Sequence, residues 1–294
     1  MRFAHIAEQL YCRPWFITAE AHASLCLVFE RALASGLTEP RAEDLNLMDM
    51  FPKRRPLAID DETGIASIHI MGPLGKGLSK MEQSCGATSF EQIRADYAKA
   101  QEKGARGILL DFDSPGGTIT GTPETAALIA SKPVPTVAYT EDIMASCAYY
   151  LASGADMIVA STSAAVGSIG VYIPWVDRSA RYEREGMKPD PIVNAGGDLK
   201  AIGFGGKLTE AQRAHLQEEV DSSFADFKSH VRNYRAVGDG AMRGQVMSGQ
   251  RALAANLIDR VIQQTRRLNR HPPGTTPRLT AGRFVFRPIL STTN

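Results

Sequence analysis

Short apolar runs alternate with helix-like segments through the middle of the chain. The run GILLDF at 107–112 is almost continuously apolar, which is typical of a strand buried on both faces of a sheet. The alternation predicts right-handed β-α connections and a mostly parallel sheet, and therefore an α/β fold. The expected strands are 64–74, 107–112, 134–139 and 156–161, and the expected helices are 89–104, 122–132 and 145–154.

Two flanking blocks differ from this central region. The block 1–57 has helical spacing followed by a charged, proline-rich stretch, so we expect an N-terminal helical arm and a linker. The main domain is expected over 58–265, and it includes a long helix at 208–236 that starts with capping-box spacing at Thr209. The tail 266–294 is rich in Arg and Pro and is predicted to be poorly ordered.

Charge and composition narrow the classes of partner. The 294 residues carry 33 Lys and Arg against 32 Asp and Glu, so no charge excess favours nucleic acid. No run of about 18 apolar residues and no signal-peptide core occur, which predicts a cytoplasmic protein with no membrane partner. No HExxH motif or P-loop is found, so neither a metal nor a cofactor is expected. The cysteines form no CxxC pair and are interpreted as free thiols: Cys12, Cys26, Cys85 and Cys147.

Ser146 lies between an expected strand and an expected helix, with the small neighbours Ala145 and Ala148. One interpretation is an ordinary N-cap, because serine is favoured there. The other is a nucleophile, because a strand-to-helix turn exposes the hydroxyl and the helix N-terminus offers N–H groups to an oxyanion. The sequence around Ser146 leaves both interpretations open.

A second turn, SPGG at 114–117, also follows a buried strand and precedes a helix. Its proline and glycines favour a tight turn that would expose the N–H groups of Gly116 and Gly117. The carboxyl ends of parallel strands share one edge of a sheet, so we expect SPGG and Ser146 to face the same crevice. The alternative is a turn without further function.

A base that could activate Ser146 is not obvious among the histidines. His69 is the one histidine in the central strands, and the others lie in the flanks or on the long helix. A neutral lysine is the other option, but its pKa has to fall by roughly three units, at a cost of about 4 kcal/mol. Lys200, within NAGGDLKAIG, has suitable neighbours, although Asp198 would favour the charged amine. A solvated loop lysine is the alternative.

Four segments, in this order, carry a resemblance to a known family: ILLDFDSPGG, MASCAYYLASGADMIVASTSAAVGSIGVY, NAGGDLKAIG and VMSGQRALAANLIDRV. Over about 60–265 the chain resembles the signal peptide peptidase A family of serine peptidases, and most closely its phage branch of prohead or capsid-assembly proteases. The resemblance implies a Clp-protease/crotonase-like fold of repeated β-β-α units. It also implies a Ser–Lys dyad with Ser146 as nucleophile, Lys200 as general base and Ser168 orienting the lysine amine. The implied oxyanion donors are the N–H groups of Gly116 or Gly117 and of Cys147.

The resemblance therefore implies a serine endopeptidase that cleaves capsid or scaffold proteins in the host cytoplasm or the phage prohead, as a homo-oligomer. The chain departs from cellular members in having Ser146-Cys147-Ala148 where they often have Ser-Gly-Gly, and in lacking a membrane anchor. Four alternatives stay open: a crotonase-like acyl-CoA hydratase or isomerase, a cellular peptidase that degrades signal peptides, a scaffold without catalysis, and Cys147 as the nucleophile.

Overall fold

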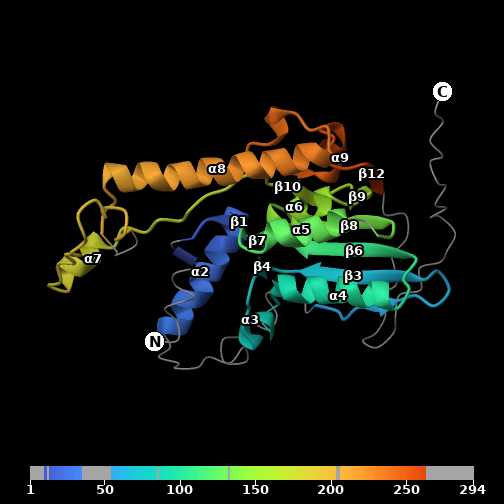
Figure 1. Ribbon diagram of the computed structural model, residues 1–294, viewed down its shortest axis with the longest axis horizontal. Coiled ribbons are helices and arrows are strands. Elements are labelled where there is room, and N and C mark those ends of the chain that lie inside the picture. Colours follow the sequence, from blue (N-terminus) through green and yellow to red (C-terminus); the bar gives the residue numbers. More distant parts are fainter. Residues whose placement is uncertain are drawn as a thin grey trace.

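The structure is a computed structural model that describes residues 10–11, 13–34, 54–84, 86–131, 133–202 and 206–262. The linker expected up to 57 falls largely outside these residues, and the tail expected over 266–294 falls wholly outside them. Figure 1 shows a body of sheet and helices from which one long helix extends.

The main sheet has parallel strands at its centre. Its order is β11-β10-β8-β6-β3-β2, and β3, β6, β8 and β10 run parallel to one another. The long strand β8 pairs with β9 through its first half and with β10 through its second half. The strands are β2 (Ala58–Ile59), β3 (Ile65–Met71), β6 (Gly107–Ser114), β8 (Thr136–Ala145), β9 (Met157–Ser161), β10 (Ala165–Gly167), β11 (Val246–Ser248) and β12 (Arg260–Ile262). The expected α/β class with a mostly parallel sheet is confirmed.

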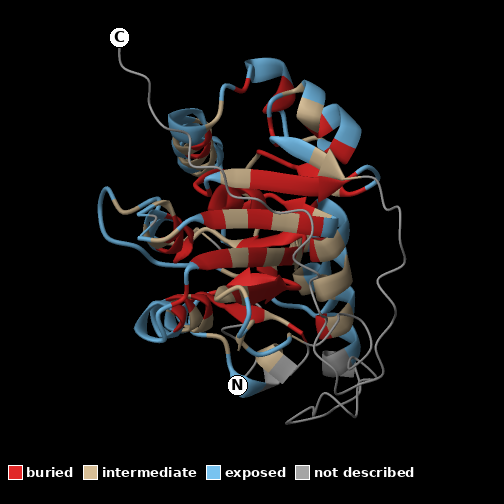
Figure 2. Cartoon of the chain, turned by 90° about the vertical axis from the view of Figure 1, so that its right-hand side faces the viewer, coloured by how far each residue is buried: buried red, intermediate tan, exposed pale blue. Residues whose placement is uncertain are grey.

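The central helices follow the expected positions. They are α4 (Phe90–Glu102), α5 (Thr122–Ala130) and α6 (Cys147–Ser153), and their apolar faces join the strands in one core. Figure 2 shows this concentration of buried residues in the strands and in the helices against them. The α6 helix is buried along its whole length, so the segment that follows Ser146 is held by packing on every side.

A small second sheet lies beside the first, with the order β1-β7-β4-β5. Its strands are β1 (Trp15–Ile17), β4 (Leu74–Gly75), β5 (Thr88–Ser89) and β7 (Gly116–Thr118). Each of β3 and β6 thus leads into a short strand of this sheet and then towards a helix. These repeated β-β-α units confirm the expected Clp-protease/crotonase-like fold. The sequence pattern did not predict the short strands, and β1 lies in the N-terminal block, for which only a helical arm and a linker were expected.

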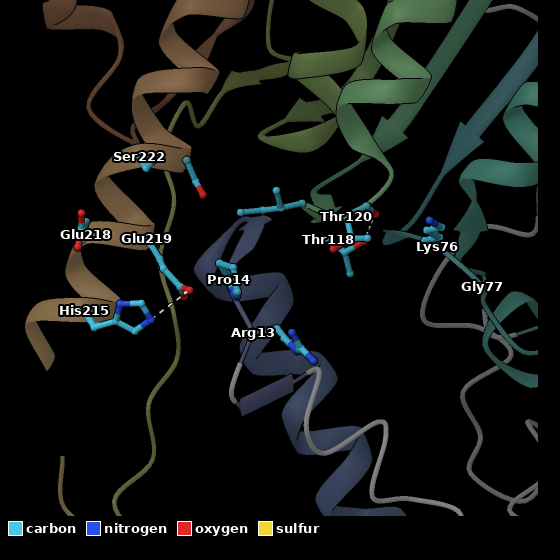
Figure 3. A pocket seen from close by; sticks show the side chains of 12 residues that line it. Arg13, Pro14, Lys76, Gly77, Thr118, Thr120, His215, Glu218, Glu219 and Ser222 are labelled. Atoms are coloured by element: carbon cyan, nitrogen blue, oxygen red, sulfur yellow. Dashed lines mark hydrogen bonds and ion pairs between the residues drawn. The ribbon is translucent and has the colours of Figure 1, made fainter. Parts of the chain in front are cut away.

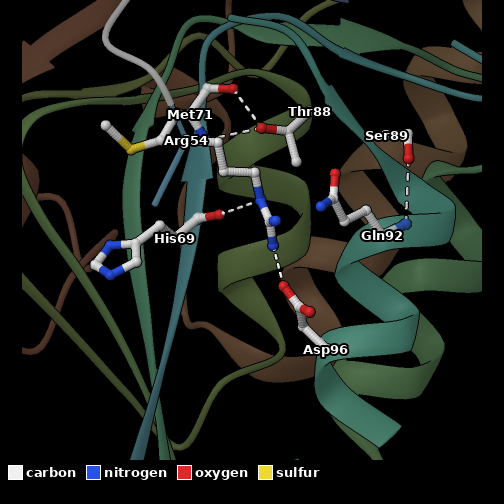
Figure 4. A network of polar contacts seen from close by, with 7 residues as sticks. All are labelled: Arg54, His69, Met71, Thr88, Ser89, Gln92 and Asp96. Carbon is white, nitrogen blue, oxygen red and sulfur yellow. Dashed lines mark hydrogen bonds and ion pairs between the residues drawn. The ribbon is translucent and has the colours of Figure 1, made fainter. Parts of the chain in front are cut away.

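A polar network ties α4 to the main sheet (Figure 4). Arg54 donates from Nε to the carbonyl of His69 at 2.9 Å, and its guanidinium pairs with Asp96 on α4. The Thr88 hydroxyl donates to the carbonyl of Met71 at 2.7 Å, and Ser89 caps the helix. Both charges of the Arg54–Asp96 pair are mostly buried, so each needs its partner.

The long helix α8 (Glu210–Tyr234) has the expected capping box at Thr209, and packs on the body only near its C-terminal end, through Phe227 and Val231. Its other half extends away from the body beside α7 (Ser179–Arg184) (Figure 1). We call residues 174–202 the projecting segment. The remaining helices are α2 (Ala19–Ala34), α3 (Lys80–Ser84), α9 (Gly249–Ala254) and the 3-10 turn η2 (Asp239–Ala241). None of the described helices is both long enough and apolar enough to cross a membrane.

Candidate active site

Ser146 occupies the junction between β8 and α6 in a strained conformation. Its φ is 55° and its ψ is −118°, a region that non-glycine residues avoid. Its N–H donates to the carbonyl of Gly167 at 2.7 Å, and its carbonyl accepts from the N–H of Tyr150 at 2.8 Å. The hydroxyl makes no capping bond, so the N-cap interpretation does not describe this residue.

The Ser146 hydroxyl is buried and has no hydrogen-bond partner, and the residue is 1% exposed. A buried hydroxyl without a partner costs about 1–3 kcal/mol, and the backbone strain costs a similar amount. A protein retains such a residue when a function requires it. Strain and an unpaired polar group at one residue are typical of a catalytic position.

The SPGG turn lies directly beside Ser146. Ser114 of β6 pairs with Met144 of β8, so the turn begins where β8 approaches the candidate nucleophile. Gly116 has a φ of 112°, and a Cβ on Gly117 would lie 2.0 Å from the carbonyl oxygen of Leu74. Only glycine fits at either position. The Gly116 N–H points to the Ser114 hydroxyl at 3.3 Å, a long contact that a better acceptor could replace.

Ser168 completes the cluster from the other side. Gly167 of β10 pairs with Ala145 of β8, and Ser168 follows with a φ of 53°. Its N–H donates to the carbonyl of Gln245 at 2.8 Å, and the residue is mostly buried. The ends of three adjacent parallel strands, β6, β8 and β10, thus bring SPGG, Ser146 and Ser168 to one edge of the sheet. The parallel-strand argument from the sequence had placed SPGG and Ser146 at such an edge, whereas Ser168 was implied only by the family resemblance.

Lys200 lies far from Ser146 in the structure. It is exposed in a turn of the projecting segment, where its N–H donates to the carbonyl of Gly197 at 2.8 Å. The carbonyl of the neighbouring Asp198 accepts a hydrogen bond from Gln212, near the start of α8. The contact between α8 and α6 lies near the other end of α8, where the ring of His230 stacks on Tyr150 with centroids 3.9 Å apart. The path from Gln212 to His230 along the helix is about 27 Å. The single chain therefore does not bring Lys200 to Ser146.

Cys147 is fully buried behind the candidate nucleophile. Its Sγ lies 3.0 Å from the hydroxyl of Thr122, and burial raises the pKa of the thiol to about 12. A thiol with so high a pKa is protonated near neutral pH, which argues against Cys147 as the nucleophile. Its backbone N–H lies in the first turn of α6.

No described histidine activates Ser146, since the serine hydroxyl has no partner. His69, the histidine kept as a possibility, lies with Nδ1 2.8 Å from Asp111 on the neighbouring strand. Burial lowers the pKa of both His22 and His230, which contact the carbonyls of Leu10 and Tyr150. His5 and His271 lie outside the described residues.

Asp113 is the titratable group nearest to SPGG in the sequence. Burial, together with the charges of Asp142 and Asp111, raises its pKa to about 6. Desolvation and like charges both disfavour the ionised carboxylate. Within the described ranges, no group of three or more His, Cys, Asp or Glu side chains is arranged to hold a metal ion.

A cavity of about 910 Å³ opens at the far end of β7 (Figure 3). One wall is α8, with His215 paired to Glu219 at 3.5 Å, and Lys76 lies across from it. The lining combines apolar surface with side chains of both charge signs. The lining residues are Arg13, Pro14, Lys76, Gly77, Thr118, Ile119, Thr120, His215, Glu218, Glu219, Ser222 and Ser223.

The repeated β-β-α units and the mostly parallel sheet give the chain a Clp-protease/crotonase-like fold. Residues 128–271, which include Ser146, Ser168 and Lys200, match the sequence profile described as "Peptidase family S49". The family resemblance in the sequence motifs is thereby confirmed.

Curated relatives include proteins of phages and of bacteria. Capsid assembly protease C of Escherichia phage lambda is 26% identical over 89% of this chain and 63% of its own length. The head-tail preconnector protein GP5 of Enterobacteria phage P21 is 28% identical over 68% of this chain and 41% of its own length. The putative signal peptide peptidase SppA of Enterococcus faecium is 29% identical over 55% of this chain and 48% of its own length. The chain thus spans less than two thirds of each of these relatives.

A solved structure of the ClpP protease catalytic domain from Plasmodium falciparum is also similar, with 11% identity, a TM-score of 0.40, and coverage of 68% of this chain and 86% of that one.

Proposed function

We propose that the chain is a serine endopeptidase that cleaves capsid or scaffold proteins during phage head maturation, in the host cytoplasm or the prohead. The observation that carries the proposal is Ser146, whose backbone is strained and whose hydroxyl is buried and unpaired beside a glycine turn, in a chain that matches a peptidase family profile over residues 128–271. The phage setting is supported by the two phage relatives, which are named for capsid assembly and for the head-tail preconnector.

In the proposed reaction, the Ser146 hydroxyl attacks a peptide carbonyl while its proton passes to a base. The oxyanion accepts hydrogen bonds from the N–H of Cys147 and from the N–H of Gly116 or Gly117. The base then gives the proton to the leaving amine. Water repeats the sequence on the acyl-enzyme, because the same base can deprotonate it.

Lys200 is the proposed base, and the distance within one chain requires that a second copy supply it. The projecting segment is suited to this, since it exposes several large apolar side chains that a neighbouring copy would cover. They are Val176, Met187, Ile192, Val193 and Leu199. Contact with a partner would also remove Lys200 from water, which a neutral amine needs. Ser168 would orient the amine, and the protein would act as a homo-oligomer.

A complementation experiment tests the dyad and its assembly together. Ser146→Ala and Lys200→Ala should each abolish labelling by a fluorophosphonate and abolish peptide hydrolysis. Mixing the two inactive proteins after dissociation should restore about a quarter of the sites, because random pairing joins a Ser146 copy to a Lys200 copy at that frequency. Activity that survives in Lys200→Ala would remove Lys200 from the mechanism. Labelling that survives in Ser146→Ala would remove Ser146.

The natural substrate can be identified by co-expression. Candidate capsid and scaffold proteins are expressed with the wild type or with Ser146→Ala, and new termini are mapped by mass spectrometry. Termini that appear only with the wild type support head maturation. The cellular alternative, favoured by the Enterococcus relative, predicts instead the cleavage of short signal-peptide remnants and no cleavage of capsid proteins.

A further inference from the structure

The strand β1 lies in a slot between two other segments of the chain. On one side it pairs antiparallel with β7, with Phe16 opposite Gly117 and Ile17 opposite Gly116. On the other side the Trp15 N–H donates to the carbonyl of Tyr172 at 3.0 Å. At its end, the Thr18 N–H donates to the carbonyl of Pro115 at 3.0 Å, within the SPGG turn. β1 is therefore held by backbone bonds along both edges.

Both walls of this slot start at the candidate active site. β7 begins at Gly116 of the SPGG turn. The opposite wall, 168–172, begins directly after Gly167, whose carbonyl accepts the Ser146 N–H. An extended peptide that adds to an exposed strand edge beside the nucleophile would bind in this slot, through the same backbone groups that now bind β1.

We propose that β1 is an internal pseudo-substrate, which fills the peptide slot and has to leave before a protein substrate enters. The proposal rests on the proposed peptidase function, because that function makes the slot a substrate site. The free chain is then a latent form, and the partner that displaces β1 is an extended peptide segment of the substrate.

Side-chain packing connects the filled slot to the covered nucleophile. Phe16 is 2% exposed and packs against the rings of Tyr150 and Phe227, with centroids 5.8 Å and 4.8 Å away. Those two rings also contact each other, with centroids 4.9 Å apart. Tyr150 is one helical turn beyond Ser146, whose carbonyl accepts its N–H. β1 thus packs against the helix that presents the nucleophile, in the same state in which Ser146 is 1% exposed.

The N-terminal arm, described over 10–11 and 13–34, has a small core of its own. Trp15 and Ile17 pack with residues of this arm, in a cluster separate from the main core, whose members are Leu10, Trp15, Ile17 and Phe29. In Figure 1, α2 extends from β1 along the outside of the body. An arm with a separate cluster can leave the slot without dismantling the main core, apart from the site of Phe16.

The cavity beyond β7 continues the slot. Arg13 and Pro14, which lead into β1, line this cavity together with Thr118 at the end of β7 (Figure 3). Residues upstream of a peptide in the slot would enter the same space. Departure of β1 would therefore open one continuous groove, from the cavity of about 910 Å³ to the SPGG turn.

An engineered disulfide can hold β1 in place reversibly, and we call it the lock. Trp15 lies opposite Thr118, and its N–H points to Tyr172, away from β7. Such a non-hydrogen-bonded antiparallel pair has Cα atoms about 4.5 Å apart, within the range that a disulfide spans. The double variant Trp15→Cys/Thr118→Cys should form a disulfide under oxidation, and reduction should release it. Wild type treated with the same oxidant controls for the native cysteines.

A second pair of variants loosens β1. Trp15→Pro removes both the ring and the N–H that binds Tyr172, whereas Trp15→Ala removes the ring alone. The two variants differ in one backbone hydrogen bond of the slot. Thermal unfolding of the body, followed by circular dichroism, verifies that both proteins are folded.

The test measures binding of a fluorescein-labelled peptide with the sequence of residues 13–19, RPWFITA, by anisotropy. We expect Trp15→Pro to bind it at least about tenfold more tightly than Trp15→Ala, because apparent affinity scales with the fraction of open slots. The oxidised lock should not bind the peptide, and reduction should restore binding. Equal binding by the oxidised and reduced lock, or no gain in Trp15→Pro, overturns the proposal.

Fluorophosphonate labelling in the same samples separates the two proposals. Labelling of the oxidised lock at the rate of the reduced protein contradicts the pseudo-substrate and leaves the serine chemistry intact. Peptide binding that follows the lock, with no labelling of Ser146 in any sample, contradicts the catalytic proposal and supports the slot.

Discussion

The N–H of Ser146 donates to the carbonyl of Gly167 at 2.7 Å, and this bond joins the end of β8 to the end of β10. It fixes Ser146 in its positive-φ conformation and sets Ser168, the next residue after Gly167, beside it. The bond requires β8 to change neighbours, from β9 in its first half to β10 in its second. The sheet topology therefore brings the Gly167 carbonyl to the strained residue.

Replacing Ser146 should separate stability from activity. Ser146→Gly relieves the backbone strain and removes the unpaired hydroxyl, so we expect the free energy of unfolding to rise by about 1–3 kcal/mol. Ser146→Ala removes the hydroxyl but keeps the strain, and should gain less. Denaturant unfolding measures both, and peptide hydrolysis should be lost in both. A Ser146→Gly protein less stable than Ser146→Ala would show that the conformation is not strained.

The close approach at Gly117 predicts a severe effect of one methyl group. A Cβ there would lie 2.0 Å from the carbonyl oxygen of Leu74, so Gly117→Ala should separate β7 from β4 and lower the free energy of unfolding by about 3 kcal/mol or more. Gly238→Ala is the control, since nothing lies within 4 Å of its Cβ position. Urea denaturation of the two variants checks the difference, and similar midpoints would contradict it.

The raised pKa of Asp113, about 6, predicts a pH dependence of stability. The folded state keeps this proton at pH values where the unfolded chain has lost it, so the stability contribution is full below about pH 4 and is lost as the pH rises through about 6. Asp113→Asn should therefore raise the melting temperature more at pH 8 than at pH 4. Equal shifts at the two pH values would refute the assignment.

Arg235 supports α6 from its C-terminal end. Its guanidinium donates to the carbonyls of Ser153 and Ala155 and pairs with Asp259 at 2.6 Å, and its side chain is 8% exposed. Arg235→Ala should cost about 2–3 kcal/mol, because buried carbonyls lose their donors, and Arg235→Lys should recover only part of this.

The exposed pair of Arg232 with Asp239, at 2.5 Å, is the matched control for Arg235, and Arg232→Ala should cost less than about 1 kcal/mol. Thermal unfolding of the three variants ranks their losses of stability. If Arg232→Ala lost as much stability as Arg235→Ala, burial would not determine how much each arginine contributes to stability.

Much of the site follows from local sequence patterns. Apolar runs and helical spacing located β6, β8, α5 and α6, and the rule that parallel strands end at one edge brought SPGG to Ser146. The strain at Ser146 has no signature in its neighbours, because it arises from a bond to Gly167, twenty-one residues away.

The strand β1 and the position of Lys200 could not be predicted from the sequence pattern for a different reason. β1 has three residues, too few for a period, and it pairs with a strand about a hundred residues later. Lys200 lies in a segment whose position depends on α8 and on exposed apolar residues, so its local sequence does not determine where it points.

The length of α8 determines how far the projecting segment lies from the body. The helix is anchored to the body at Phe227 and Val231 and carries the projecting segment at its other end, so the number of residues between sets the reach of that segment. Removing seven residues from the exposed half would shorten the reach by about 10 Å and keep nearly the same helical face. In the proposed homo-oligomer, the number of residues from Thr209 to Phe227 would therefore determine the spacing of neighbouring subunits.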